Sequence, residues 1–149
     1  MTNKYESTNM EVKLRRNDLV YPELSYKIVG CAYDVFNELG PGHYEKYYQK
    51  ALASSFEIQK LSYKEQVYYP LKFKNEVIGK SFFDFLVEDK VIVEIKKDLR
   101  FSKARVDQVV NYLNISGLRL ALLINFAKDE VVFKRFVNIN NEDSYIRKN

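Results

Sequence analysis

Residues 81–96 read SFFDFLVEDKVIVEIK and place three ionisable side chains inside two apolar, strand-like runs. Asp84 interrupts the first run, and Glu94 and Lys96 interrupt the second. Burying an ionised carboxylate among apolar side chains is costly unless the charge is paired or binds a metal ion. The three groups therefore predict a cation site between two buried strands.

The polar residues at 88–90 predict a turn that joins the two runs into a β-hairpin. Such a hairpin brings Asp84 opposite the second strand, near Glu94. Because side chains alternate along a strand, we expect Asp84 to share a face with Phe82 and Leu86.

Two carboxylates and an amine in one pocket are typical of a metal-dependent phosphodiesterase. Hard oxygen ligands such as those of Asp84 and Glu94 suit Mg2+ or Mn2+. A bound metal ion acidifies water and stabilises the charged transition state, and the Lys96 ammonium group can hold the nucleophile or the scissile phosphate.

The composition bounds the class of protein. A chain of 149 residues with 46% hydrophobic and 15% aromatic content can bury one core, so we expect a single domain. Cys31 is the single cysteine and His43 the single histidine. These counts exclude an intramolecular disulfide framework and a cysteine-based zinc finger, and they argue against a histidine-based triad.

The net charge of +4 and the pI near 9.0 permit binding to a polyanion without requiring it. Tyrosines lie among lysines at residues 44–48 and 63–69, where the rings could stack on bases or simply pack in the core. The polar N-terminus and the lack of a long apolar run predict a cytoplasmic protein with no membrane partner.

Hydrophobic periodicity and turn residues predict two helices, three strands, a third helix and two final strands. In chain order these elements cover residues 22–39, 44–59, 65–73, 77–87, 90–97, 102–116, 118–126 and 130–137. Ser102 is the predicted N-cap of the third helix, and Gly117 is predicted to end it. Residues 1–21 are predicted to be an N-terminal tail or arm, 22–138 the folded domain, and 139–149 a polar C-terminal tail. The apolar run at 120–124 suits a strand buried on both faces, so we expect an α/β sandwich.

This order of motifs resembles the PD-(D/E)XK nuclease superfamily. A helix precedes a hairpin with Asp84, the Glu94-x-Lys96 element follows, and a helix and a buried strand come next. In addition, Gly42-x-x-Glu45-x-x-Tyr48 resembles the signature of the small bacterial GxxExxY proteins. The resemblance implies a restriction-endonuclease-like fold with a central mixed sheet of about five strands flanked by helices.

The resemblance also implies roles for individual residues. Asp84 and Glu94 would bind the metal ion, Lys96 would be the catalytic lysine, and Glu45 would be a further acid contributed by a helix. Gln108 and Tyr112, one turn apart on the third predicted helix, would complete the catalytic site, with Gln108 orienting the attacking water or a phosphate. One departure is Phe83, which precedes Asp84 where the superfamily's name has proline.

Each of these residues also has a structural interpretation. Asp84 can pair with Lys96 or Arg105 for stability alone, and the charges of Glu94 and Lys96 can form a cross-strand surface pair. Glu45 can favour the positive end of a helix dipole. Gln108 and Tyr112 can form a pair on a helix surface.

Lys103 and Arg105 lie near the start of the third predicted helix, where they can contact phosphates or form a solvated basic face. The resulting hypothesis is a Mg2+-dependent nuclease acting on DNA, with a homodimer as a further possibility. The alternatives are a nuclease-like module that binds nucleic acid or a protein without cutting, and a hydrolase of nucleotides or cyclic phosphates.

Overall fold

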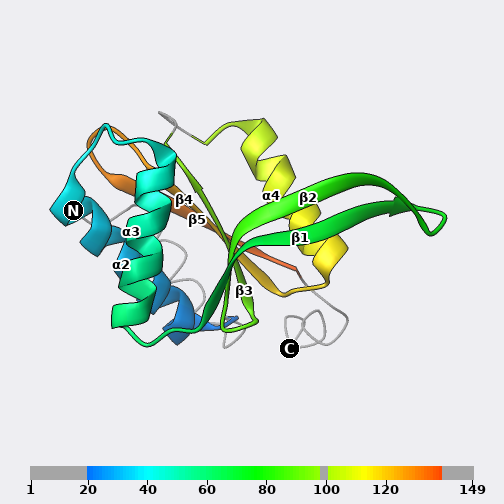
Figure 1. Cartoon of the computed structure of the whole chain (residues 1–149), viewed down its shortest axis with the longest axis horizontal. Coiled ribbons are helices and arrows are strands. Elements are labelled where there is room, and N and C mark those ends of the chain that lie inside the picture. The colour runs from blue at the N-terminus through cyan, green and yellow to red at the C-terminus, as the bar shows by residue number, and fades with distance from the viewer. Residues whose placement is uncertain (1–19, 98–100, 139–149) are drawn as a thin grey trace, which may run out of the picture.

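The computed structural model describes residues 20–97 and 101–138 (Figure 1). Within them, three helices and five strands follow one another in the predicted order. They are α2 (Pro22–Leu39), α3 (Glu45–Ile58), β1 (Tyr63–Phe73), β2 (Glu76–Val87), β3 (Val91–Lys96), α4 (Lys103–Ser116), β4 (Leu120–Phe126) and β5 (Val131–Val137). The predicted element boundaries agree with these to within about two residues.

The five strands form one mixed sheet in the order β1-β2-β3-β4-β5. Strands β3 and β4 pair in parallel, and the helix α4 connects them, whereas the other three neighbouring pairs are antiparallel. Helices α2 and α3 lie on one side of the sheet and α4 on the other (Figure 1). The predicted α/β sandwich with a central mixed sheet is therefore confirmed.

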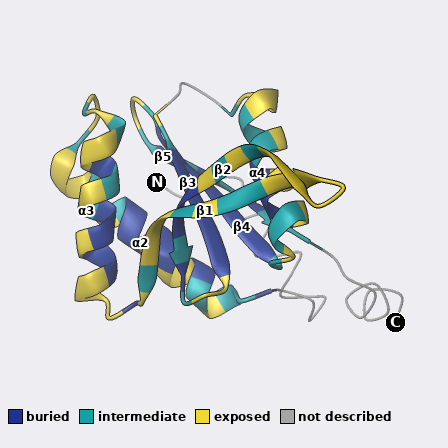
Figure 2. Ribbon diagram, turned by 45° about the vertical axis from the view of Figure 1, so that its right-hand side comes forward, coloured by how far each residue is buried: buried dark blue, intermediate teal, exposed yellow. Residues whose placement is uncertain are grey.

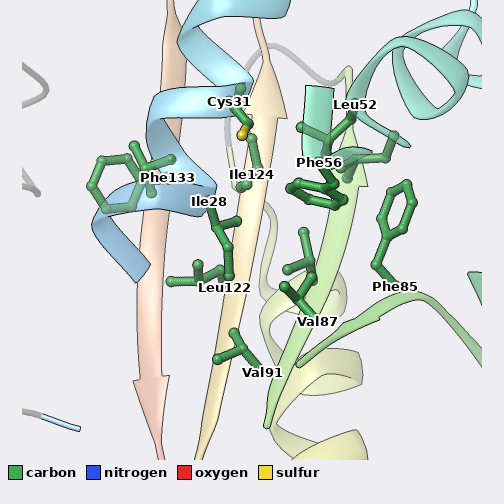
Figure 3. Close-up of a cluster of buried hydrophobic side chains, with 14 of the residues drawn as sticks. Ile28, Cys31, Leu52, Phe56, Phe85, Val87, Val91, Leu122, Ile124 and Phe133 are labelled. Carbon is green, nitrogen blue, oxygen red and sulfur yellow. The ribbon is translucent and has the colours of Figure 1, made fainter. Parts of the chain in front are cut away.

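The centre of the sheet is buried on both faces, as the apolar runs predict (Figure 2). Every residue of β4 is buried, and Leu122 and Ile124 point to the α2–α3 side while Ala121 and Leu123 point to the α4 side. Figure 3 shows the larger of the two cores, on the α2–α3 side, where Phe56 meets Phe85 edge to face with ring centroids 5.2 Å apart. The two cores thus cover β3 and β4 from both sides of the sheet.

Local sequence signals set the ends of the helices. Pro22 begins α2, at a position where its missing N–H is not needed. The Ser102 side chain accepts the backbone N–H of Arg105 at 3.2 Å and caps α4, as predicted. Gly117 ends α4 in the left-handed conformation that glycine adopts readily.

The predicted N-terminal arm falls mostly outside the described residues, and the predicted C-terminal tail at 139–149 falls wholly outside them. The last two residues of the arm are described: Val20 is buried in the core and Tyr21 packs against it. The buried guanidinium group of Arg135 on β5 donates hydrogen bonds to the Val20 carbonyl and the Ser25 hydroxyl, which ties this segment to the sheet. Among the described helices, none combines the length and apolar character that crossing a bilayer requires.

Candidate active site

The candidate site lies where β2 and β3 stop pairing. Their ladder ends at Phe85 and Val93, one residue short of Asp84 and Glu94. There the side chains replace the ladder: Asp84 N–H donates to Glu94 Oε1 at 2.7 Å, and Ile95 N–H donates to Asp84 Oδ2 at 2.8 Å. The predicted approach of Asp84 to Glu94 is confirmed, and each carboxylate is fixed by the opposite strand's backbone.

Both carboxylates are buried, with Asp84 9% and Glu94 2% exposed. Burial raises the pKa of Asp84, against the opposing effects of the Ile95 N–H, Lys96 and Gln66. Burial, followed by the like charge of Asp84, raises the pKa of Glu94 from 4.5 to about 8. Two buried acids, of which Asp84 disfavours the ionisation of Glu94, are suited to share a cation.

Lys96 lies on the same face of β3 as Glu94, two residues along the strand. Its Nζ is 3.8 Å from Glu94 Oε2, and its side chain is only 14% exposed. This placement contradicts the interpretation of the two charges as a surface ion pair. An ammonium group is therefore held at the edge of the carboxylate pair.

The side chains of β2 do not alternate regularly between the two faces of the sheet around Asp84, which corrects the regular alternation predicted from the sequence. Phe83 and Leu86 both pack on the α4 side of the sheet, although three residues apart in a regular strand they would face opposite sides. Phe85 packs on the α2–α3 side. The expectation that Asp84 shares one regular face with Phe82 and Leu86 is therefore wrong, because the strand rotates at the fork.

Two glutamines that the sequence did not single out complete the surroundings of Asp84. Gln66 lies opposite Asp84 on β1, and its Nε2 donates to Asp84 Oδ1 and to Gln49 Oε1, both at 3.2 Å. Gln66 has the left-handed φ of 48°, which is uncommon for this residue type and uncommon in a strand. Gln49 lies one turn after Glu45 on α3, and that spacing is the one sequence signal that could have indicated it.

Glu45 is the first residue of α3, and its charge adds to the rise in the pKa of Glu94. Across residues 20–97 and 101–138, however, no three acidic, histidine or cysteine side chains are grouped as a metal site. The structure thus joins Asp84 and Glu94 directly and places Glu45 within electrostatic range of them.

Tyr48, the last residue of the Gly42-x-x-Glu45-x-x-Tyr48 motif, anchors the loop before α3. Its buried ring stacks on Phe126 with centroids 4.4 Å apart. Its hydroxyl donates to the Gly40 carbonyl at 2.6 Å and accepts the His43 N–H at 3.3 Å. Tyr48 therefore positions the loop that leads into Glu45.

The same loop is fixed at two further points. His43 Nε2 lies 2.8 Å from the Leu39 carbonyl, so the ring caps the C-terminal end of α2. Lys97, directly after β3, donates from Nζ to the His43 carbonyl at 2.8 Å. These contacts tie the start of α3 to the end of the strand that carries Glu94.

Gln108 and Tyr112 meet one turn apart on α4. Gln108 Nε2 donates to the Tyr112 hydroxyl, which donates in turn to the Phe82 carbonyl, both at 2.9 Å. Tyr112 is buried, so these residues are not a helix surface pair. Burial, followed by the charges of Glu94 and Asp84, raises the pKa of Tyr112 to about 12, which keeps its hydroxyl a donor.

Lys103 and Arg105 lie in the first turn of α4, on the opposite side of the sheet from α3. Lys103 is exposed and Arg105 is half-buried. Their predicted contact with phosphates stays a prediction.

Comparisons with known proteins agree with this architecture. The family model of the PD-(D/E)XK nuclease superfamily matches residues 22–136. No curated protein matches the chain. Among solved structures, the chain resembles the protein described as SSO0001, with a TM-score of 0.51 and 15% identity over 68% of this chain and 54% of that one. This chain therefore spans about half the length of that protein.

A second solved structure is the alkaline exonuclease LHK-Exo from Laribacter hongkongensis, with a TM-score of 0.45 and 10% identity over 83% of this chain and 87% of that one. The fold is restriction-endonuclease-like, as predicted. The narrower resemblance to GxxExxY proteins stays a prediction. Because the family model covers most of the chain, including both strands of the fork, the protein belongs to the PD-(D/E)XK nuclease superfamily.

Proposed function

We propose that the protein is a metal-dependent nuclease that hydrolyses phosphodiester bonds in DNA. The proposal rests on one observation above all: Asp84 and Glu94 are buried together at the fork of β2 and β3 and held there by backbone N–H groups. These hydrogen bonds still leave two acids side by side in the core, and a bound cation would offset their charge. Membership of a nuclease superfamily supports the same conclusion.

The donor set fits a hard divalent cation. Carboxylate oxygens are the ligands that Mg2+ and Mn2+ prefer, and a cation would relieve the raised pKa of Glu94. We assign Asp84 and Glu94 as its ligands, with Glu45 as the third acid. When bound, such an ion would acidify a water and offset charge on the phosphate.

The remaining side chains divide the other tasks between them. Lys96, with its ammonium group beside Glu94, is assigned to offset negative charge that develops on the phosphate. Gln108 is assigned to orient the attacking water through its amide. Tyr112 positions Gln108 and anchors it to the backbone of β2. Lys103 and Arg105 are assigned to phosphates further along the strand.

End-labelled single- and double-stranded DNA and RNA, incubated with the purified protein in Mg2+ or Mn2+, test this function. Asp84→Asn and Lys96→Ala should each lower cleavage by about 100- to 1,000-fold, the usual effect of removing a group that stabilises transition-state charge. Asp89→Asn and Lys90→Ala are matched controls, because both residues are exposed in the turn of the same hairpin. The controls should cleave like the parent.

Cleavage by Asp84→Asn at the parent's rate would contradict the assignment. Binding of nucleic acid without turnover in either metal would instead favour the binding module. Turnover of cyclic or nucleotide phosphodiesters with intact DNA and RNA would favour the small-molecule hydrolase.

A cytoplasmic location and a homodimer are part of the same proposal, as is a folded domain at residues 22–138. Light scattering on the purified protein tests the dimer. A monomer that cleaves DNA would remove the dimer from the proposal and leave the nuclease assignment in place.

A further inference from the structure

The outer part of the β1–β2 hairpin projects beyond the rest of the described fold (Figure 1). From here on, the arm means residues 67–82 of this hairpin, and not the N-terminal segment at residues 1–21. Its surface is largely exposed (Figure 2), and it holds six of the twelve exposed large hydrophobic side chains among the described residues. These are Tyr68, Leu71, Phe73, Val77, Ile78 and Phe82. Apolar side chains concentrated on one projecting element mark an interaction surface.

The two faces of the arm differ. Val67 and Tyr69 pack with the core on the α4 side, so that face is anchored. On the other face Tyr68 pairs with Phe82 across the strands, with ring centroids 5.4 Å apart. These rings are 46% and 47% exposed, so a pair of aromatic surfaces faces solvent.

The arm is also basic. It contains Lys72, Lys74 and Lys80 against a single acid, Glu76, for a net charge of +2. All three lysines are exposed, and the strand register places Lys80 opposite Pro70 and Lys72 opposite Val77, on either side of a bulge. Exposed rings interleaved with lysines fit a nucleic-acid strand, because rings stack on unpaired bases and ammonium groups attract phosphates.

A protein partner fits the arm less well. Lysine is depleted in the centre of protein interfaces. Strand β1 lies at one edge of the sheet. Pro70 and Lys72 on this strand, and Lys74 in the turn that follows it, oppose the addition of another strand. A second copy of the chain would therefore meet unfavourable charge and a missing N–H along this edge.

The exposed aromatic pair is continuous with the candidate site. Phe82 is two residues before Asp84, which corresponds to about 7 Å along a strand. The Phe82 carbonyl accepts the Tyr112 hydroxyl, which fixes the base of the arm against α4. A strand lying over Tyr68 and Phe82 would therefore lead directly to the fork of β2 and β3.

We propose that the arm binds an unpaired stretch of the substrate strand, with Tyr68 and Phe82 stacking on its bases and Lys72 and Lys80 attracting its phosphates. This inference rests on the proposed nuclease function and narrows its substrate to nucleic acid with single-stranded character. The arm is a binding surface, and hydrolysis occurs at Asp84 and Glu94.

Fluorescence anisotropy tests the inference with a labelled oligothymidine and with a labelled duplex of equal length. The full chain carries Asp84→Asn in every sample, so that binding is measured without cleavage. Tyr68→Ala with Phe82→Ala should raise the Kd for the oligothymidine at least tenfold, from the loss of base stacking. Tyr26→Ala with Ile58→Ala is the matched control, because these side chains are exposed on helices away from the arm.

A second pair of substitutions tests the charges. Lys72→Gln with Lys80→Gln should make the negative slope of log K, the association constant, against log salt shallower by about 1.4. This is the value expected for two phosphate contacts on a single strand. Thermal unfolding and circular dichroism verify that each variant is folded. An arm variant that is folded and binds within twofold of the parent overturns the inference, as does a parent that binds only the duplex or neither probe.

Cleavage with Asp84 intact separates this inference from the proposed function. Tyr68→Ala with Phe82→Ala should raise KM for single-stranded DNA and leave kcat within twofold. Cleavage with an unchanged KM would contradict strand binding by the arm and leave the nuclease assignment in place. If the parent cleaves no nucleic acid but the arm variants lose oligothymidine binding, the result supports strand binding by the arm and contradicts the nuclease assignment. If light scattering shows that the parent is a dimer that these substitutions break, and nucleic-acid binding is unchanged, the arm contacts a second copy of the chain and the inference is contradicted.

Discussion

The Glu94 carboxylate accepts the backbone N–H of Asp84 at 2.7 Å, at the point where β2 and β3 part. The Asp84 carboxylate accepts a backbone N–H from β3 in return. Each carboxylate thus accepts a backbone N–H where the pairing between β2 and β3 has ended, and its second oxygen is left to other partners. This arrangement makes the site a consequence of strand divergence, and it explains why two acids are tolerated in the core.

The first prediction concerns stability, pH and metal removal. The pKa of Glu94 is raised from 4.5 to about 8, so between these values the folded state keeps a proton that the unfolded state has lost. Its contribution to stability is fully present below 4.5 and is lost as the pH rises through about 8. In EDTA, the free energy of unfolding should therefore fall across this range, and Mg2+ should restore most stability at its upper end.

Thermal unfolding over this pH range, with EDTA and with Mg2+, measures the effect. Glu94→Gln should flatten the pH dependence and abolish the response to Mg2+. Glu65→Gln is the control, since Glu65 is exposed on β1. The same slope in Glu94→Gln as in the parent would show that another group carries the pH dependence.

The second prediction concerns Gln66, whose amide holds Asp84 in place. Gln66→Gly and Gln66→Ala both remove this hydrogen bond and should lower kcat by about 10- to 100-fold, the usual effect of losing a group that orients a metal ligand. The two variants should differ in stability, because glycine adopts the left-handed φ of 48° easily and alanine does not. We expect Gln66→Gly to be the more stable by about 1 kcal/mol.

Cleavage kinetics and urea unfolding on both variants provide the measurement. Gln59→Ala, at an exposed helix end, is the control. Parental kcat in both variants would mean that Gln66 does not position Asp84.

The third prediction concerns Tyr48. Tyr48→Phe keeps the stack on Phe126 and removes the hydroxyl that joins Gly40 to His43. We expect a loss of about 1 kcal/mol in the free energy of unfolding. The variant should also need more Mg2+ for half-maximal cleavage, because the loop that positions Glu45 is loosened.

Urea unfolding and Mg2+ titration of the cleavage rate test this pair of effects. Tyr47→Phe is the matched control, because Tyr47 is the neighbouring tyrosine and is 49% exposed. A stability loss with an unchanged Mg2+ requirement would make Tyr48 a structural residue without influence on Glu45.

Much of the fold could be predicted from the sequence because its signals are local. The cap at Ser102, the stop at Gly117 and the apolar run of β4 each depend on neighbours in the chain, and each is confirmed. The approach of Asp84 to Glu94 followed from a short hairpin turn for the same reason. The catalytic and metal-binding roles assigned to these residues stay predictions.

Other features could not be predicted because they depend on contacts between distant segments. Gln66 and Gln49 are 17 residues apart. The spacing of Gln49 from Glu45 indicates at most a shared helix face, and no sequence pattern indicates that the two amides meet beside Asp84. The irregular alternation of β2 side chains around Asp84 depends on the cores on the two sides of the sheet, because Phe83 packs in one core and Phe85 in the other.

By itself, the sequence determined which segments are helices and strands, the order in which they follow, and which acids stand in buried strands, because periodicity and turn chemistry act over a few residues. Only the tertiary structure decided that β2 and β3 part at Asp84 and Glu94, that Gln66 turns its amide to that fork, and that the arm leaves its aromatic face bare. The reason is physical: burial, strand divergence and the pKa of Glu94 arise from packing between segments that the chain brings together only when folded.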